Sequence, residues 1–198
     1  NNISNYNNAS KTHLPGLFIQ NQILFKPNHT LLLGLRYDRN SIHGSILTPR
    51  VNYKINNSDK SSSLRLSSGS GYRIAQIFTE DHAALTGARE VLFTENLNPE
   101  KSWNANLNYV QKFFLKQGVI IDLDLSLFKT HFSNKIIPDY DTDPNKIIYS
   151  NLNGKSISNG ISVNANLLAQ RGIRINLGAT YIDTYAEDNG VKTMPYLT

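Results

Sequence analysis

The chain has 198 residues and a mass of 22.2 kDa, with 20 Lys and Arg against 15 Asp and Glu. It contains no cysteine, which excludes disulfides, thiolate metal ligands and a cysteine nucleophile. The mean hydropathy is −0.36, and no apolar run approaches the ~20 residues that a membrane helix requires. That criterion covers helices only, because a transmembrane strand needs just ~9–11 residues of alternating character. The composition is unusual in its 25 Asn and 18 Ser.

Residues 1–16 are rich in Asn, show no hydrophobic period and end at Pro15-Gly16, so we expect a loop or linker there. From Leu17 onward the apolar residues recur with period two, which predicts strands rather than helices. The predicted strands cover residues 17–25, 31–38, 49–55, 64–72, 102–114, 119–131, 157–168 and 173–185.

Each predicted strand has one apolar and one polar face. In the strand 119–131, for example, Leu123, Leu125 and Leu127 share one face, whereas Asp122 and Asp124 lie on the other. Such alternation fits two all-β architectures. In a soluble β-sandwich the apolar face is buried, and in a membrane β-barrel it faces lipid.

Two features favour the barrel. The polar faces carry Asn, Ser, Asp, Gly and Arg with few Lys or Glu, unlike most faces in contact with solvent. The predicted connections also alternate in length, as the turns and outer loops of membrane barrels do. The short connections are residues 26–30, 56–63, 115–118 and 169–172, and the long ones are 39–48, 73–101 and 132–156.

Three segments carry a family resemblance. The segment Leu97-Asn98-Pro99-Glu100-Lys101-Ser102 resembles the Leu-x-Pro-Glu-[Arg/Lys]-Ser motif of TonB-dependent outer-membrane receptors, where it opens a barrel strand after a long loop. Thr48-Pro49-Arg50-Val51 resembles the start of an earlier strand in that family. Gly69-Ser70-Gly71-Tyr72-Arg73 resembles the end of the strand between them. The amino-acid sequence of the loop residues 79–87 is similar to that of receptors from the Bacteroidota.

The resemblance implies an antiparallel transmembrane β-barrel over residues 17–198, with about eight strands of a 22-stranded type. It also implies a location in the outer membrane, in contact with lipid. Family members carry an N-terminal plug domain and a segment that contacts TonB, and neither is found in these residues. The implied function is TonB-energised uptake of a scarce solute such as a ferric siderophore, cobalamin or another metal chelate. The alternative is a soluble, secreted β-sandwich that binds carbohydrate or protein.

The long connection 73–101 is the candidate ligand-binding region, because long loops in compact proteins are often functional. Arg73 and Arg89 offer paired donors to carboxylate or phosphate groups of a chelate. Glu80, His82 and Glu90 are the other candidates, with Asp81 beside them. The simpler alternative is that these charged residues form ion pairs that order the loop.

Other candidate sites have structural explanations. Asp122 and Asp124 are expected to pair with Arg or Lys of neighbouring strands rather than to act as an acid–base pair. The segment Asp139–Asn145 resembles the start of a calcium loop, but it lacks the Gly and Glu of that motif, so a solvated turn is expected. The five His residues are scattered without metal-ligand spacing.

The sequence gives no indication of an enzyme, a cofactor or a nucleic-acid partner. No Gly-rich phosphate loop or nucleophile motif is present, and the excess positive charge is spread along the chain without a basic run. We therefore expect a transport protein without a catalytic, metal or cofactor site of its own.

Overall fold

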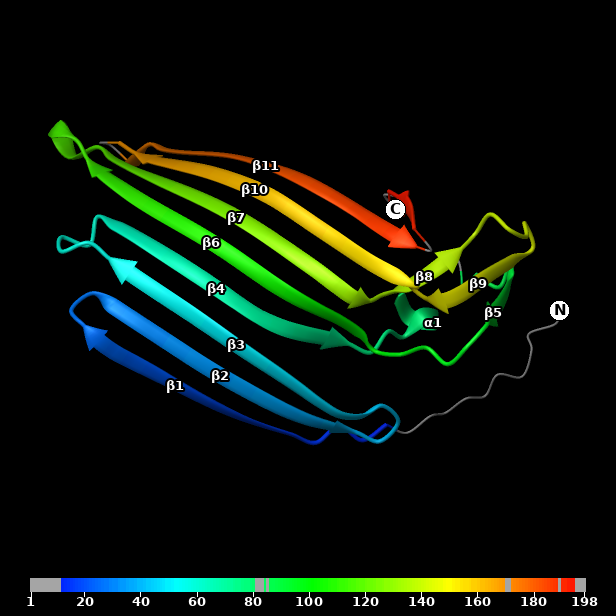
Figure 1. The fold of residues 1–198 in the computed structure, drawn as a ribbon. Helices are drawn as coiled ribbons and strands as arrows, with labels where there is room; N and C mark the ends of the chain where they lie inside the picture. The colour runs from blue at the N-terminus through cyan, green and yellow to red at the C-terminus, as the bar shows by residue number, and fades with distance from the viewer. Residues whose placement is uncertain (1–11, 81–83, 85, 170–171, 189, 195–198) are drawn as a thin grey trace.

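A computed structural model describes residues 12–80, 84, 86–169, 172–188 and 190–194, except for the side chains of Thr79 and Glu80. These residues form one large antiparallel sheet and one small sheet (Figure 1). We call the large one the main sheet; its strands lie in the order β1-β2-β3-β4-β6-β7-β10-β11-β12. They are β1 (Gly16–Lys26), β2 (His29–Asn40), β3 (Gly44–Asn56), β4 (Ser62–Arg73), β6 (Glu100–Phe114), β7 (Ile120–Asn134), β10 (Gly154–Leu168), β11 (Arg174–Asp188) and β12 (Val191–Thr193).

All eight strands predicted from the period-two pattern are present, and each extends beyond its predicted range at one or both ends. Each strand from β1 to β11 in the main sheet pairs with its sheet neighbours in antiparallel register, so successive connections lie at opposite ends of the sheet. The connections 27–28, 57–61, 115–119 and 169–173 lie at one end, which we call the turn end. Each connection contains a residue with a positive φ angle, which allows the chain to reverse tightly: Asn28, Lys60, Gln117 and Gly172.

The opposite end, the loop end, departs from the prediction at the connection between β2 and β3. Residues 39–48 were expected to form a long loop, and this prediction is wrong, because the two strands pair as far as Asn40 and Gly44. The Oδ1 atom of Asn40 accepts hydrogen bonds from the backbone N–H groups of Ile42 (2.7 Å) and His43 (2.8 Å). Gly44, with φ of +77°, completes the three-residue turn. An Asn side chain that caps a turn therefore shortens this connection.

The two other predicted loops at this end fold into a second sheet. It contains β5 (Glu90–Phe93), β9 (Lys146–Asn151) and β8 (Ile136–Asp139), in that order, and a single helical turn, α1 (Ile77–Glu80), lies nearby. We call it the loop-end sheet; Figure 1 shows it grouped with α1 beyond the ends of the long strands. The pairing of β5 with β9 is parallel and joins residues more than 50 positions apart, so no local pattern predicted it.

The core of the described structure lies at the loop end. Ile147 and Tyr149 of β9 are 0% and 2% exposed, and Ile136 of β8 packs with them. The buried apolar residues outside this cluster, such as Ile46 and Ile157, also come from segments at or near the loop end of the strands. Half-buried apolar residues around the cluster are Ala75, Ile77, Val91, Leu97 and Tyr140.

The main sheet has no such core. Its apolar face is exposed, with Leu177 and Tyr181 of β11 each 68% exposed. Among the described residues no second sheet or helix packs across the long strands, so the sandwich alternative is wrong. No helix in the described ranges is long and apolar enough to cross a bilayer.

Candidate functional site

The motif at 97–102 forms an ionic clamp at the loop end. Glu100, which opens β6, is 5% exposed. Its Oε2 atom lies 2.7 Å from both Nε and Nη2 of Arg73, the last residue of β4. Its Oε1 atom accepts a hydrogen bond from the backbone N–H of Ile136 at 3.0 Å. One carboxylate thus connects two strands of the main sheet to β8, an edge strand of the loop-end sheet.

Asparagine side chains hold the residues just before this clamp. Nδ2 of Asn134 donates to the carbonyl oxygens of Asn98 (3.2 Å) and Pro99 (3.0 Å). Oδ1 of Asn151 accepts from the N–H of Asn98 at 2.9 Å, and its Nδ2 donates to the carbonyl of Asn96, also at 2.9 Å. The recognisable motif is therefore an anchor between the two sheets.

The candidate ligand residues of the 73–101 region have different surroundings. Nη1 of Arg89 donates to the carbonyl of Tyr140 at 3.1 Å, which joins the two long connections. Glu90 opens β5 with its N–H bonded to the carbonyl of Asn145 at 2.8 Å, while its side chain is exposed. Glu80 lies in α1, and its side chain is not described. His82, like Asp81, lies outside the described residues.

The alternative in which charged residues order the loop fits Arg73 and Arg89, because both bind protein groups. Each guanidinium carries five N–H donors, and that of Arg89 uses Nη1 in its bond to Tyr140. Both side chains lie on the loop-end region that the two connections build together.

An aromatic row on the loop end was missed by the sequence reasoning. The rings of Phe78 and Phe93 meet edge to face at 6.1 Å, and Phe93 stacks on Tyr149 at 5.9 Å. Tyr149 is buried, but Phe78 and Phe93 are 44% and 40% exposed. No periodic pattern in the sequence indicates this row, because the three residues come from three separate short elements.

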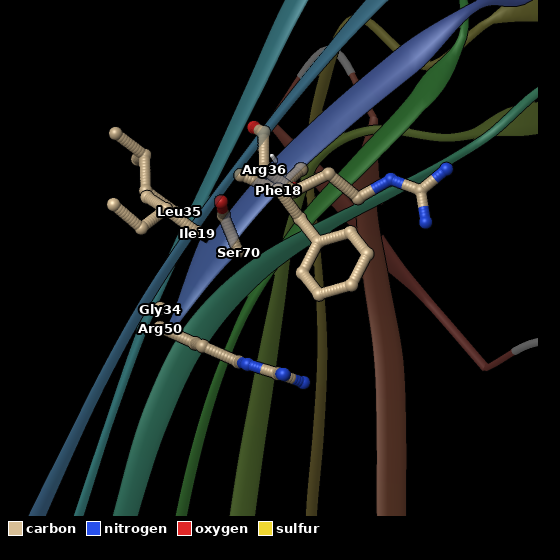
Figure 2. A pocket seen from close by; sticks show the side chains of 8 residues that line it. Phe18, Ile19, Gly34, Leu35, Arg36, Arg50 and Ser70 are labelled. Carbon is tan, nitrogen blue, oxygen red and sulfur yellow. Dashed lines mark hydrogen bonds between the residues drawn. The ribbon is translucent and has the colours of Figure 1, made fainter. Parts of the chain in front are cut away.

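A second feature missed from the sequence is a pocket of about 330 Å³ lined by residues of β1, β2, β3 and β4. Figure 2 shows Phe18, Arg36 and Arg50 extending to one side of the sheet, whereas Ile19 and Leu35 extend to the other. The guanidinium of Arg36 contacts both carboxylate oxygens of Asp38, at 2.7 and 2.9 Å.

The prediction that Asp122 and Asp124 pair with Arg or Lys of neighbouring strands is wrong. Oδ1 of Asp124 accepts from Nδ2 of Asn108 at 2.6 Å, on the neighbouring strand β6. Asp122 lies opposite Lys112 in the register, yet its Oδ1 atom is buried without a hydrogen-bond partner. Amide groups replace the expected cations, because the polar face of this part of the sheet is built mainly from Asn and Ser.

The Asp139–Asn145 segment forms a turn that uses its own carboxylates. Asp139 accepts hydrogen bonds from the Thr142 hydroxyl and from the N–H groups of Thr142 and Asp141, which lowers the pKa of its carboxyl group. The N–H of Asn145 and the ammonium of Lys146, 3.3 Å away, lower the pKa of Asp143. These bonds occupy oxygens that a calcium ion would need.

Solved structures share this fold. The siderophore receptor PirA from Pseudomonas aeruginosa matches with a TM-score of 0.73 and 19% identity, over 90% of this chain and 36% of its own. A mutant of the ferric enterobactin receptor PfeA from the same organism, in complex with enterobactin, gives 0.66 and 18%, over 86% and 27%. The FrpB iron transporter from Neisseria meningitidis gives 0.67 and 16%, over 89% and 26%.

The chain therefore spans about a quarter to a third of the length of these receptors. A search of the curated proteins finds no match to this sequence. The family model described as TonB dependent receptor-like, beta-barrel matches residues 1–197. The antiparallel main sheet and its exposed apolar face agree with such a barrel wall, and the chain belongs to this family.

Proposed function

We propose that this chain is part of the barrel wall of an outer-membrane receptor that takes up a scarce solute with energy from TonB. A ferric siderophore is the first candidate for the solute, and cobalamin or another metal chelate is the next. The observation that supports the proposal is that the main sheet of this TonB-dependent receptor family member leaves its apolar face exposed. Its apolar residues point away from any protein core, and lipid is the medium that would cover them.

The solute is proposed to contact the loop end. Arg73 ends β4, Arg89 directly precedes β5 and Glu90 opens it, and Glu80 and His82 belong to the same connection. Guanidinium groups suit the oxygen atoms of an anionic chelate, because their N–H donors match the geometry of carboxylate and phosphate. The exposed rings of Phe78 and Phe93 add an apolar surface for a planar or aromatic part of the solute.

Partners follow from the same proposal. TonB would act through a plug region that is not in this sequence, and the polar face of the main sheet would line the lumen. The similarity of residues 79–87 to receptors of the Bacteroidota stays a prediction about origin.

Uptake of iron chelates tests the function. The full-length receptor is expressed in an outer-membrane receptor-deficient bacterium and challenged with ⁵⁵Fe-loaded siderophores, enterobactin first. We expect uptake of at least one chelate that stops when TonB is deleted. Uptake that continues without TonB, or accumulation of the receptor in the soluble fraction, would contradict the proposal.

The ligand residues are tested by the pair Arg89→Gln and Phe93→Ala in the same strain. We expect uptake at limiting chelate to fall about tenfold with either variant, as loss of about 1.4 kcal/mol of binding implies. Lys116→Gln at the turn end is the matched control and should leave uptake unchanged. Equal uptake by all three variants would remove the loop end as the binding region.

A further inference from the structure

The strands β3 and β4 are not paired at the loop end. Their ladder ends at the pair Arg50–Gly69, although residues 44–49 of β3 and 70–73 of β4 still belong to strands. On their other sides these residues stay paired, with β2 and with β6. We call the two unpaired stretches the seam. Because both strands have their sheet neighbours within the described residues, the seam is not an outer edge of the sheet.

Pro49 gives the physical reason for the end of the ladder. The N–H of Asn56 donates to the carbonyl of Asn28, just before β2. Even-numbered residues of β3 therefore turn their backbone polar groups toward β2, and odd-numbered ones turn them toward β4. The next hydrogen-bonded pair in this register would join Pro49 to Ser70, and proline has no N–H to donate. A proline inside a sheet is accordingly expected where pairing with one neighbour stops.

One side chain bridges the seam. The hydroxyl of Tyr72 on β4 donates to the carboxylate of Asp38 on β2, across the unpaired part of β3. Arg36 contacts the same carboxylate at 2.7 and 2.9 Å, and Asp38 is 0% exposed. Ile46, which lies opposite Asp38 on β3, is buried as well. We call the contact between Tyr72 and Asp38 the latch, because it holds the loop-end half of the β2–β3 hairpin against β4.

Other polar groups around the seam lack partners. Nδ2 of Asn40, near the tip of the hairpin, and Oγ of Ser70, on β4, are buried without a hydrogen-bond partner among the described residues. By the alternation above, the backbone N–H groups of Leu47 and Tyr72 face the seam, and the ladder does not pair them across it. Each buried polar group without a partner costs free energy, so the latched arrangement is held weakly.

The hairpin also faces a space rather than a packed surface. A pocket of about 380 Å³ separates its residues His43 and Ile46 from the 97–102 motif and from Ser133 and Asn134 of β7. If the hairpin moved away from the motif, this pocket would widen. No hydrogen bond between β3 and β4 would be broken, because the ladder forms none in the seam.

We propose that the loop-end half of the β2–β3 hairpin, residues 38–49, is a flap that swings away from β4 and is held shut by the latch. The bend lies at Pro49 and Arg50, because β3 is paired on both sides from Arg50 onward. Opening the flap enlarges the pocket beside the 97–102 motif, so the flap sets the width of that pocket. The inference concerns the wall itself and does not depend on which solute the receptor carries.

Distances between two spin labels test the flap in the purified full-length receptor. The labels are placed at Ile42→Cys, at the hairpin tip, and Ser133→Cys, across the pocket, after any cysteine elsewhere in the receptor is replaced by serine. Tyr72→Phe removes the latch hydroxyl. We expect it to raise the ratio of long to short distances about tenfold, as loss of one hydrogen bond to a charged group implies. Pro49→Ala restores an N–H to the ladder and should lower that ratio.

Tyr109→Phe is the matched control. It also removes a hydroxyl, one that donates to Gln111 at 2.8 Å on β6, away from the seam. This variant should leave the distances unchanged, and a change equal to that of Tyr72→Phe overturns the proposal. One narrow distance shared by the unaltered receptor, Tyr72→Phe and Pro49→Ala overturns it too. If Tyr72→Phe does not fold, Pro49→Ala decides: a lower ratio supports the flap, and an unchanged ratio refutes it.

Hydrogen exchange distinguishes a flap from a seam that another part of the receptor fills. Measured residue by residue in the full-length receptor, the amides of Leu47 and Tyr72 should exchange about tenfold faster than those of Ile46 and Thr48, which face β2 within its ladder. Equal protection of all four amides would show that another segment of the receptor pairs with the seam. That result would overturn the flap.

Discussion

The main sheet and the loop-end sheet bury their apolar residues in opposite ways. The loop-end sheet closes a core of its own around Ile147 and Tyr149, which water does not reach. The main sheet leaves Leu177 and its neighbours uncovered on a face that has no protein partner among the described residues. One chain therefore carries two kinds of apolar surface, a protein core at the loop end and an exposed face along the strands, for which we propose lipid as the medium.

The clamp of Glu100 lies between the two regions. It joins β4 and β6 of the main sheet to β8 of the loop-end sheet through Arg73 and Ile136. Four substitutions test the contrast, and their expected effects decrease in the order given below.

Tyr149→Ala should have the largest effect, and a local one. Removing a buried aromatic side chain costs about 3–5 kcal/mol through lost contacts and the cavity left behind. We expect the backbone amides of residues 135–153 in the full-length receptor to lose protection against hydrogen exchange. The amides of β6 and β7 should stay protected. Equal loss of protection in the middle of β7 would show that the main sheet and the loop-end sheet unfold together, which would contradict their independence.

Leu177→Arg tests the apolar face of the main sheet. A charge at the lipid face near the bilayer midplane costs about 2–4 kcal/mol. The matched control is Asn176→Arg, one residue away and on the polar face. Folding of the full-length receptor into lipid vesicles, measured by urea titration, should be weakened by the first substitution only. Similar midpoints for the two variants would remove lipid as the medium of this face.

Glu100→Gln tests the clamp. The variant keeps the shape of the side chain but loses the charge that Arg73 contacts at 2.7 Å, and hydrogen bonds to charged groups contribute about 1.5–3 kcal/mol. We expect faster proteolysis within residues 74–99 and little change in folding of the strands. Arg73→Lys, which keeps a cation, should have a smaller effect; an unchanged proteolysis pattern in Glu100→Gln would show that the clamp contributes nothing.

Asp139→Asn should have the smallest effect, seen only as pH dependence. Hydrogen bonds from Thr142 and Asp141 lower the pKa of the folded Asp139 carboxyl group. Its contribution to the turn is therefore complete above the unfolded pKa of about 3.9 and is lost as the pH falls through the lower folded value. Exchange at residues 141–145 should rise below about pH 4 in the unaltered receptor and show no such step in the variant; a step in both would assign it to another group.

Much of the main sheet could be predicted because its information is local. The alternation of Leu123, Leu125 and Leu127 with Asp122 and Asp124 defines a strand and its two faces without reference to any other segment. The 39–48 connection was mispredicted because the cap formed by Asn40 depends on where the strand pairing stops.

The loop-end features could not be predicted in the same way. β5 and β9 lie more than 50 residues apart in the chain, and each is too short to show a period. Of the five candidate ligand residues, Arg73 and Arg89 are now known to bind protein groups, and their contact with a solute stays a prediction, as it does for Glu80, His82 and Glu90. The ion pair of Arg73 with Glu100 joins residues 27 positions apart, which is beyond the reach of a local pattern.

The strand content and the two faces of each strand follow from the sequence alone, and the segments 48–51, 69–73 and 97–102 together indicated the family. This is possible because side-chain alternation and a short motif are local properties of the chain. Only the fold shows which apolar groups are buried in protein and which stay exposed, since among the described residues no second layer lies over the main sheet. The fold also decided that Tyr72 meets Asp38 across the seam, because strand register, and not sequence distance, brings the two side chains together.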